Sequence, residues 1–269
     1  MESLPDWAPE GIDLTKASAA RMHDYHLGGG HNFGVDRELA RKVLAVYPYA
    51  PLLAQASRAF LHRAVRFLIS QGIRQFIDIG SGIPTMGNVH ETAQREDPAS
   101  RVLYVDRDPV AVAHSELMLR DTPKAAVLQA DLREPQAILD SVQRRELIDL
   151  SRPVAVLMVA VLHFISEDDR PDEAIQLIHD AVVPGSFLVI SHGLTVDQPT
   201  EADQIITLYR STADPLTYRP RARILELFNG WDLVEPGLVW VPEWRPDWPD
   251  EVGADPTKSA FVAAVARKK

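Results

Sequence analysis

The sequence predicts an α/β fold, in which a mostly parallel sheet of seven strands has helices on both faces and follows a helical N-terminal extension. Three observations support this. From residue 75 onward, five short apolar runs alternate with amphipathic stretches, as strands and crossover helices do in a parallel sheet. Two apolar segments near the C-terminus fit a closing antiparallel pair, and residues 15–72 instead follow helical spacing.

The five predicted parallel strands follow one another at even spacing, at residues 75–79, 101–106, 125–131, 153–159 and 185–191. Between them lie four amphipathic stretches that we expect to be helices, at residues 88–96, 109–120, 135–147 and 171–183. Three of these begin with proline, which suits the first helical turn because its missing N–H would be unpaired there anyway. The boundaries are therefore those of βαβ units.

The flanking segments differ from this repeat. Residues 37–47 and 57–72 are the clearest helices of the N-terminal part, and further helices are expected around 201–212 and 221–228. Segments 231–241 and 259–268 read as the antiparallel pair, while the prolines of 242–256 indicate a surface loop. We therefore divide the chain into a helical extension at residues 1–72 and a sheet-bearing domain at 73–269, packed as one structural unit.

Composition narrows the range of partners. The 28 basic and 38 acidic residues give a net charge of −10, which repels phosphate backbones, so no nucleic acid partner is expected. The chain has no cysteine, which excludes zinc thiolate sites and cysteine nucleophiles. Its longest apolar stretch, 153–165, is shorter than the roughly 20 residues of a membrane span, and residues 1–20 lack an apolar signal segment. We expect a cytoplasmic protein with no membrane contact.

The stretch QFIDIGSGIPT places Gly80 and Gly82 between a strand and a helix, where open α/β sheets bind ligands. A dinucleotide fingerprint would read G-x-G-x-x-G, but here the third glycine is Gly87, and Pro84 removes a backbone N–H. The pattern disfavours a pyrophosphate. A tight turn without any ligand would be the alternative if these glycines stood alone.

Acidic residues at the ends of the next two strands point to the same crevice. Asp106 follows Gly82 by 24 residues, where a carboxylate can accept both hydrogen bonds of a ribose diol. Asp131 can meet an adenine amino group while Leu132 packs on the ring, although capping of its own turn is an alternative. Asp78 lies inside a strand and needs a partner, either the glycine turn or a cofactor amine.

At these residues the sequence resembles class I S-adenosylmethionine (SAM) dependent methyltransferases. FIDIGSGIPT is similar to their first motif, YVDRD to the end of their second strand, QADL to that of the third, and residues 158–192 to their fourth and fifth strands. More specifically, RMHDYHLGGGHNFGVDR resembles the N-terminal signature of a bacterial S-adenosyl methyltransferase family long known as a domain of unknown function. His23, Gly30 and His31 depart from that signature, replacing an aromatic residue, a lysine and an aspartate, which puts the family's substrate or affinity in doubt for this chain.

The resemblance covers nearly the whole chain and implies a Rossmann-like class I methyltransferase with SAM as cofactor. It implies cofactor contacts at the residues that match the motifs, namely Tyr25, Gly28, Asn32, Asp78, Gly80, Ser81, Gly82, Thr85, Asp106, Arg107, Asp131, Leu132 and Ala160. Arg58, near the start of a predicted helix, is a candidate bidentate partner for the methionine carboxylate, with a surface position as the alternative.

Three consecutive glycines, Gly28 to Gly30, lie between predicted helices and give the backbone unusual freedom. We expect this segment to act as a lid that excludes water from the SAM crevice, and the alternative is a flexible connection without that role. Late in the chain, Trp231, Trp240, Trp244 and Trp248 could line an acceptor pocket or pack in strands and loops.

The leading functional hypothesis is methyl transfer to a small-molecule acceptor. If the acceptor is a hydroxyl, His163 after the fourth strand is the best candidate base and His192 the second, the alternative for either being a histidine bonded to backbone. A non-catalytic SAM-binding or regulatory protein is a second hypothesis, because no base is unambiguous. A nicotinamide oxidoreductase is a third, which the interrupted glycine pattern and the absence of a Tyr-x-x-x-Lys pair disfavour.

Overall fold

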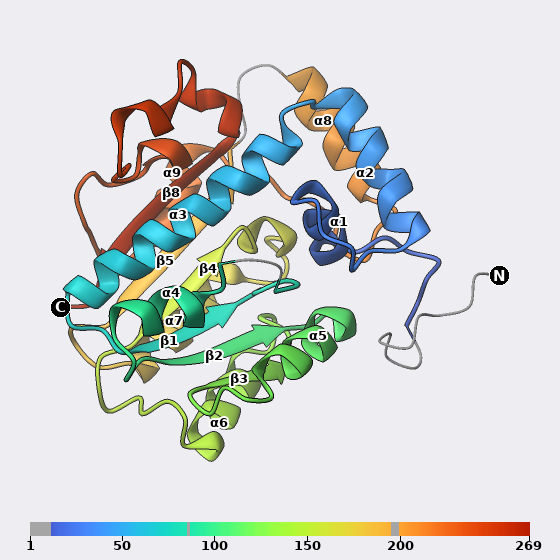
Figure 1. Ribbon diagram of the computed structural model, residues 1–269. Coiled ribbons are helices and arrows are strands. Elements are labelled where there is room, and N and C mark those ends of the chain that lie inside the picture. The colour runs from blue at the N-terminus through green and yellow to red at the C-terminus, as the bar shows by residue number, and fades with distance from the viewer. Residues whose placement is uncertain (1–11, 85–86, 195–198) are drawn as a thin grey trace.

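A computed structural model describes residues 12–84, 87–194 and 199–269 (Figure 1). At its centre lies one sheet with strand order β3-β2-β1-β4-β5-β8-β6, in which β7 also pairs with β8. The strands are β1 Gln75–Ile79, β2 Arg101–Asp106, β3 Ala125–Gln129, β4 Ala155–Val159, β5 Phe187–Gly193, β6 Asp232–Leu233, β7 Val239–Trp240 and β8 Phe261–Arg267. The first five pair in parallel and β8 is antiparallel to β5, which confirms the mostly parallel sheet.

The sheet has eight strands where the sequence predicted seven, because segment 231–241 forms two short strands that both pair with β8. Between them, Pro236 has no N–H to give to a ladder, and Gly237 donates its N–H to the carbonyl of Val234 in a turn. The order of the parallel strands reverses between β1 and β4. Such a switch point opens a crevice at the carboxyl ends of the strands, where ligands bind.

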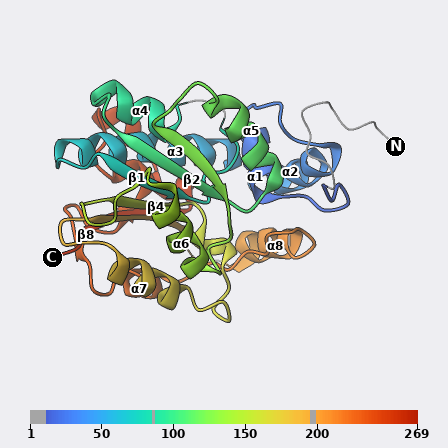
Figure 2. The same cartoon turned by 90° about the horizontal axis from the view of Figure 1, so that it is seen from below.

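Helices cover both faces of the sheet, as expected (Figure 2). On one face lie α3 Ala50–Ser70, α4 Val89–Glu96 and α5 Pro109–Leu119, whose buried side chains share a core with the sheet. On the other lie α6 Pro135–Arg145 and α7 Pro171–Ala181, and α9 Arg221–Glu226 lies beside α7, where Arg223 pairs with Asp172. The predicted proline starts of α5, α6 and α7 are confirmed.

A helical cap stands at the carboxyl ends of the strands, made of α1 Ala19–His26, α2 Gly34–Val46 and α8 Pro199–Tyr209 (Figure 1). Met22, Leu39 and Val43 of α1 and α2 form a small core of their own, on which Leu208 and Tyr209 of α8 pack. The cap therefore joins two segments that are far apart in sequence.

Residues 242–256 contain no strand, as predicted, and include the short 3-10 helices η2 Val241–Glu243 and η3 Pro249–Val252, with η4 Pro256–Ser259 at the end of the segment. Trp244 of this segment is fully buried, with its ring 5.4 Å from that of Phe60. Arg63 donates to the carbonyl oxygens of Val241 and Trp244 and so attaches the segment to α3. Within the described part of the chain, no helix combines the length and the apolar character needed to cross a membrane.

Candidate functional site

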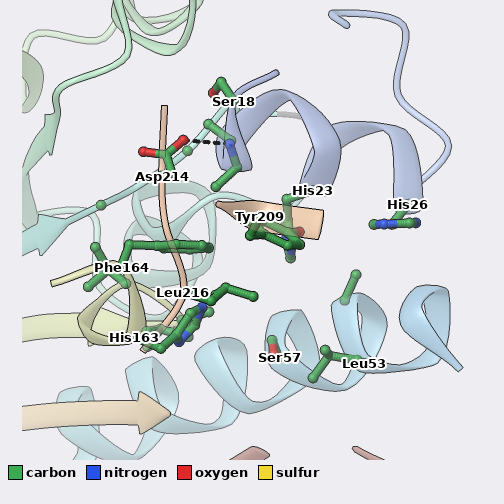
Figure 3. A pocket seen from close by; sticks show the side chains of 18 of the residues that line it. Ser18, His23, His26, Leu53, Ser57, His163, Phe164, Tyr209, Asp214 and Leu216 are labelled. Carbon is green, nitrogen blue, oxygen red and sulfur yellow. Dashed lines mark hydrogen bonds between the residues drawn. The ribbon is translucent and has the colours of Figure 1, made fainter. Parts of the chain in front are cut away.

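A cavity of about 940 Å³ lies between the carboxyl ends of the parallel strands and the helical cap (Figure 3). This volume is near the upper end of the roughly 300–1,000 Å³ typical of small-molecule sites, so two small ligands can share it. Its walls come from the turns after β1, β2, β3 and β4, from α1, α3 and α8, and from segments near residues 213–218 and 257–261. None of the four candidate tryptophans is among the described residues of the wall. Trp231 and Trp244 are buried elsewhere in the fold, whereas Trp248 is 71% exposed.

The glycine turn after β1 forms one wall. Gly80 and Gly82 have φ angles of 72° and 67°, a region that side chains disfavour. A Cβ atom on Gly80 would lie 2.3 Å from Val161 of the turn after β4, whereas one on Gly82 would meet nothing within 4 Å. The hydroxyl of Ser81 is buried and has no partner in the described chain. Gly80 thus lets two turns approach closely, and the backbone of the turn stays open to a ligand.

Asp106 ends β2 and is fixed by two backbone donors. Its Oδ2 accepts from the N–H of Gly82 at 2.7 Å, and its Oδ1 accepts from the N–H of Asp108 at 2.8 Å. Burial raises the pKa of Asp106 to about 6, and these two N–H groups oppose that shift. Each carboxylate oxygen has a second lone pair. The oriented carboxylate can therefore accept two further hydrogen bonds from a ligand in the cavity.

Asp78 and Arg58 contribute opposite charges to the same cavity. Asp78 is buried in β1, and burial raises its pKa to about 7, against the lowering effect of the nearby Arg58 guanidinium. Arg58 reaches the wall from α3, and burial lowers its pKa. Neither side chain has a hydrogen bond or ion pair to another described residue. A carboxylate and a guanidinium held in this way suit a ligand that carries both an ammonium and a carboxylate.

Arg107, Asp131 and Leu132 also line the cavity, but the two charged residues are paired. Arg107 bonds to Asp214 and lies 3.5 Å from Asp131, and Asp131 is 2.6 Å from Arg133. Asp131 also accepts from the N–H of Arg133 at 3.0 Å, which is the turn cap considered as its alternative. Leu132 is buried and is the apolar surface here.

The cap lines the cavity with other residues than the signature suggested. Tyr25, Gly28 and Asn32 lie outside the wall, and α1 instead contributes His23 and His26. Asn32 donates to Asp24 Oδ2 at 2.8 Å and to the Gly29 carbonyl at 2.9 Å, so it supports the glycine segment. Tyr25 packs on the cap core. The sequence does contain a signal for these residues, because Ala19, Ala20, His23 and His26 have the spacing of residues on one face of a helix.

Of the two remaining sequence candidates, the structure describes Ala160 but not Thr85. Ala160, after β4, lines the cavity with a φ of 57° and donates its N–H to the Ser191 hydroxyl at 2.9 Å. Thr85 lies outside the described residues. The sequence reasoning also missed Ser57, which lines the cavity beside Arg58 and one turn before Leu61 on the same face of α3.

His163 lies on η1 Leu162–Phe164, directly after β4, and lines the cavity. Its side chain is buried among the rings of Phe164, Phe261 and His192, with centroid distances of 4.3, 4.9 and 5.6 Å. Burial lowers the pKa of His163 well below 6.5, so the imidazole is neutral at neutral pH. Its Nδ1 atom has no hydrogen-bond partner in the described chain. Nδ1 therefore has an open hydrogen-bonding position, although the lowered pKa makes this imidazole a weaker base than an exposed histidine.

His192 is instead fully engaged. Its Nδ1 donates to the carbonyl of Gly193 at 2.7 Å, and its Nε2 accepts from Arg219 at 2.8 Å. Burial lowers the pKa of His192 to about 3, and the residue does not line the cavity. Its position fits the backbone-bonded alternative. Arg219 also donates to the carbonyls of Leu162 and Ile165, on either side of His163, and so holds η1 in place.

Several known proteins are similar to this chain in sequence or in fold. The model of a family described as S-adenosyl methyltransferase matches residues 5–269. A DUF574 family protein from Streptomyces avermitilis is 37% identical, with a TM-score of 0.90 over 96% of this chain and 99% of the other. A protein from Thermobifida fusca, provisionally described as a methyltransferase, is 38% identical, with a TM-score of 0.91 over 98% and 100%. The mitomycin 7-O-methyltransferase MmcR shares the fold, at 18% identity and a TM-score of 0.51 over 86% of this chain and 57% of MmcR. Among curated proteins, none matches.

Proposed function

The chain belongs to the S-adenosyl methyltransferase family, and from that premise we propose how its cavity divides between SAM and a small-molecule acceptor. Methyl transfer from SAM is the activity of this family. The proposal places the cofactor along the turns after β1, β2 and β3, and the acceptor between η1, α3 and the helical cap. The net charge of −10 supports a small molecule over a nucleic acid as acceptor.

The proposal rests on three charged side chains that line the cavity beside these turns, namely Asp106, Asp78 and Arg58. Asp106 has two oxygens aligned by backbone N–H groups, which suits the two hydroxyls of a ribose. Asp78 and Arg58, which have no partners in the described chain, match the ammonium and the carboxylate of a methionine moiety. Leu132 offers an apolar surface to an adenine ring. These groups match the sugar, the amino acid part and the base of SAM, which supports SAM as the ligand of this site.

When bound, the cofactor supplies an electrophilic methyl group on a sulfonium. The protein's part is to align an acceptor atom with that methyl group and to exclude water. The cap serves this purpose, because α1 roofs the cavity and is fastened to the turn after β2. Ala19 donates its N–H to Asp214 at 2.7 Å, and the hydroxyl of Ser18 donates to Asp108.

For a hydroxyl acceptor, we assign the base to His163. Its imidazole is neutral, and Nδ1 can take a proton because no described residue occupies that atom. Arg219 keeps η1 and therefore this ring in position through its bonds to the carbonyls of Leu162 and Ile165. Activity that depends on His163 would also separate this enzyme from a SAM-binding protein without catalysis.

The proposal is tested by calorimetry with S-adenosylhomocysteine (SAH), the demethylated product. We expect saturable binding of one SAH per chain and no binding of NAD, followed by SAM-dependent methylation of hydroxylated trial acceptors. Natively folded protein that takes up neither SAM nor SAH would overturn the assignment of the site. Binding of both without methylation of any acceptor would favour the non-catalytic alternative.

A further inference from the structure

We propose that the acceptor is an uncharged aromatic molecule with a hydroxyl group, bound between His163, Ser57 and Tyr209. This inference rests on the proposed function, because the acceptor would occupy the part of the cavity that the cofactor leaves free. It goes further by naming the chemical class of the acceptor and the side chains that recognise it.

The walls of this part are rich in aromatic rings. Phe164 and Phe261 stand beside His163. Tyr209 of α8 also lines the cavity, as Figure 3 shows, and so does Tyr218 of the segment after it. Aliphatic side chains fill the spaces between them, namely Leu53, Leu61, Ile205 and Leu216. Flat rings pack well on such surfaces, both face to face with an offset and edge to face. A planar acceptor therefore fits this lining better than a flexible polar one.

The polar groups of these walls are all neutral at neutral pH. Burial lowers the pKa of His23 to about 3 and that of His163 well below 6.5, and it raises the pKa values of Tyr209 and Tyr218. These groups can donate and accept hydrogen bonds without carrying charge. A charged acceptor would lose its hydration here and gain no opposite charge in return.

The charged residues of the described wall are already placed elsewhere. Asp13, Lys16, Glu201 and Lys258 are exposed at the rim of the cavity. Arg21 pairs with Asp36, and Arg107 pairs with Asp131 and Asp214. Asp108 accepts from Ser18 and from the N–H groups of Val110 and Ala111, and Asp78, Asp106 and Arg58 are assigned to the cofactor. Inside the rim, Arg58 is thus the described wall cation that could attract an anionic acceptor instead, and the experiment below addresses that case.

Two buried polar groups call for a ligand with a hydroxyl. Ser57 and His163 are each 3% exposed, and Ser57 Oγ and His163 Nδ1 have no partner in the described chain. They come from α3 and η1, and Figure 3 draws both in the wall. A hydroxyl can donate to an imidazole nitrogen and accept from a serine hydroxyl at the same time, which a carbonyl or an ether cannot do.

The experiment measures binding of four probes by calorimetry to the full chain saturated with SAH. These are 2-naphthol, naphthalene, 2-naphthoate and trans-2-decalol, which separate the hydroxyl, the charge and the aromatic ring from one another. Phenols are un-ionised at neutral pH, since their pKa lies near 10. We expect 2-naphthol to bind at least about tenfold more tightly than the other three, which corresponds to about 1.4 kcal/mol.

Substitutions at Ser57 and His163 then show which side chains bind the hydroxyl of 2-naphthol. Ser57→Ala should weaken 2-naphthol binding about fivefold and leave SAH binding unchanged, as expected for one lost hydrogen bond. Ser70→Ala, at the exposed end of the same helix, is the matched control and should change neither. Unchanged naphthol affinity in Ser57→Ala would overturn the assigned contact. His163→Gln tests the second contact, with its SAH affinity reporting whether the variant is folded.

The possible outcomes are distinguishable. A protein that binds no SAH overturns the proposed function and this inference with it. A protein that binds SAH but prefers 2-naphthoate has an anionic acceptor site, and one that binds trans-2-decalol as tightly as 2-naphthol does not select aromatic rings. Either result, or SAH binding with no probe bound, overturns the inference alone.

Discussion

Asp106 accepts a hydrogen bond from the backbone N–H of Gly82 at 2.7 Å, and this bond ties the end of β2 to the turn after β1. If the carboxylate also binds the ribose, Asp106→Ala removes the acceptor for two hydroxyls and leaves two backbone N–H groups unpaired. We expect the SAH dissociation constant, measured by calorimetry, to rise more than tenfold, or over about 1.4 kcal/mol. Asp121→Ala, at an exposed site, is the control. An unchanged constant in Asp106→Ala would remove the ribose role.

The raised pKa of Asp78 predicts pH-dependent cofactor binding. The group titrates near pH 7 in the free protein, and a bound ammonium would favour its charged form. SAH affinity should therefore increase as the pH rises from about 6 to about 8 and then level off. Asp78→Asn should lose this rise and keep only the smaller one from Asp106, whose pKa is about 6. A wild-type affinity that stays flat over this range, in calorimetry at matched ionic strength, would contradict the role of Asp78.

The same shift makes a prediction for stability. Because the folded-state pKa of Asp78 lies above its ordinary value of 3.8, the folded protein holds this proton more tightly than the unfolded chain does. The stability due to this group is complete below about pH 4 and is lost as the pH rises through about 7. In urea titrations, the free energy of unfolding of wild type minus that of Asp78→Asn should fall across this window. A difference that rises with pH would show that the carboxyl is stabilised in its charged form.

Arg58 is predicted to recognise the carboxylate of the cofactor, and a truncated ligand separates this from a general effect. Arg58→Met should weaken SAH binding roughly tenfold or more, because a hydrogen-bonded ion pair is lost. It should leave binding of 5′-methylthioadenosine, which lacks the amino acid part, within about twofold of wild type. Because loss of Arg58 would also raise the pKa of Asp78, the two proteins are compared at several pH values above 8. Arg66→Met is the control on the same helix, since Arg66 pairs with Asp247 at the surface. Equal losses for both ligands would argue against the carboxylate contact.

Arg219 is predicted to stabilise the fold because it is buried and carries four sets of bonds. Its removal leaves two backbone carbonyls and His192 Nε2 without this donor, and Glu167 keeps only its bond to Arg223. Arg219→Leu should lower the free energy of unfolding by about 3–5 kcal/mol in urea titrations. Arg223→Leu, which also removes a partner of Glu167 but from a more exposed position, should cost about 1 kcal/mol or less. Similar losses in the two variants would mean that the buried contacts of Arg219 contribute little.

The sheet was predictable because strand length, alternation and proline starts are local signals. They predicted β1 to β5 and the crossover helices to within two residues at each end. The split of the last antiparallel segment into β6 and β7 was missed, although Pro236 and Gly237 stand in the middle of that segment. The packing of α8 on α2 was also missed, because apolar spacing shows which face of a helix is buried but not which helix it meets.

For the site, the turn residues of the sheet were predictable because their positions follow from the ends of strands. The cap was less predictable. Helical spacing places His23 and Tyr25 on different faces of α1, but it does not tell which face meets the cavity and which packs on the cap core. The sequence favoured His163 over His192 as the base, and both carried the same alternative of a backbone-bonded histidine. Arg219, which comes from far along the chain, occupies His192 and leaves His163 available.

The contact between Asp214 and Ala19 predicts how the cap opens. Asp214 accepts the first N–H of α1 and pairs with Arg107 after β2, so it fastens the roof of the cavity to the cofactor side. Asp214→Ala should speed amide hydrogen exchange in α1 while exchange in the sheet stays unchanged. Asp203→Ala, at an exposed position on α8, is the control.

Binding kinetics of this variant show whether the cap is a gate. If SAH enters and leaves through opening of α1, Asp214→Ala should raise the association and dissociation rates together, so that the dissociation constant changes less than either rate. Stopped-flow measurements resolve the two rates. A rise in the dissociation rate alone would mean that Asp214 stabilises the bound ligand without gating its access. Asp214 contacts both α1 and Arg107, so a change in affinity alone could come from either contact. The association and dissociation rates together show whether α1 gates access to the cavity.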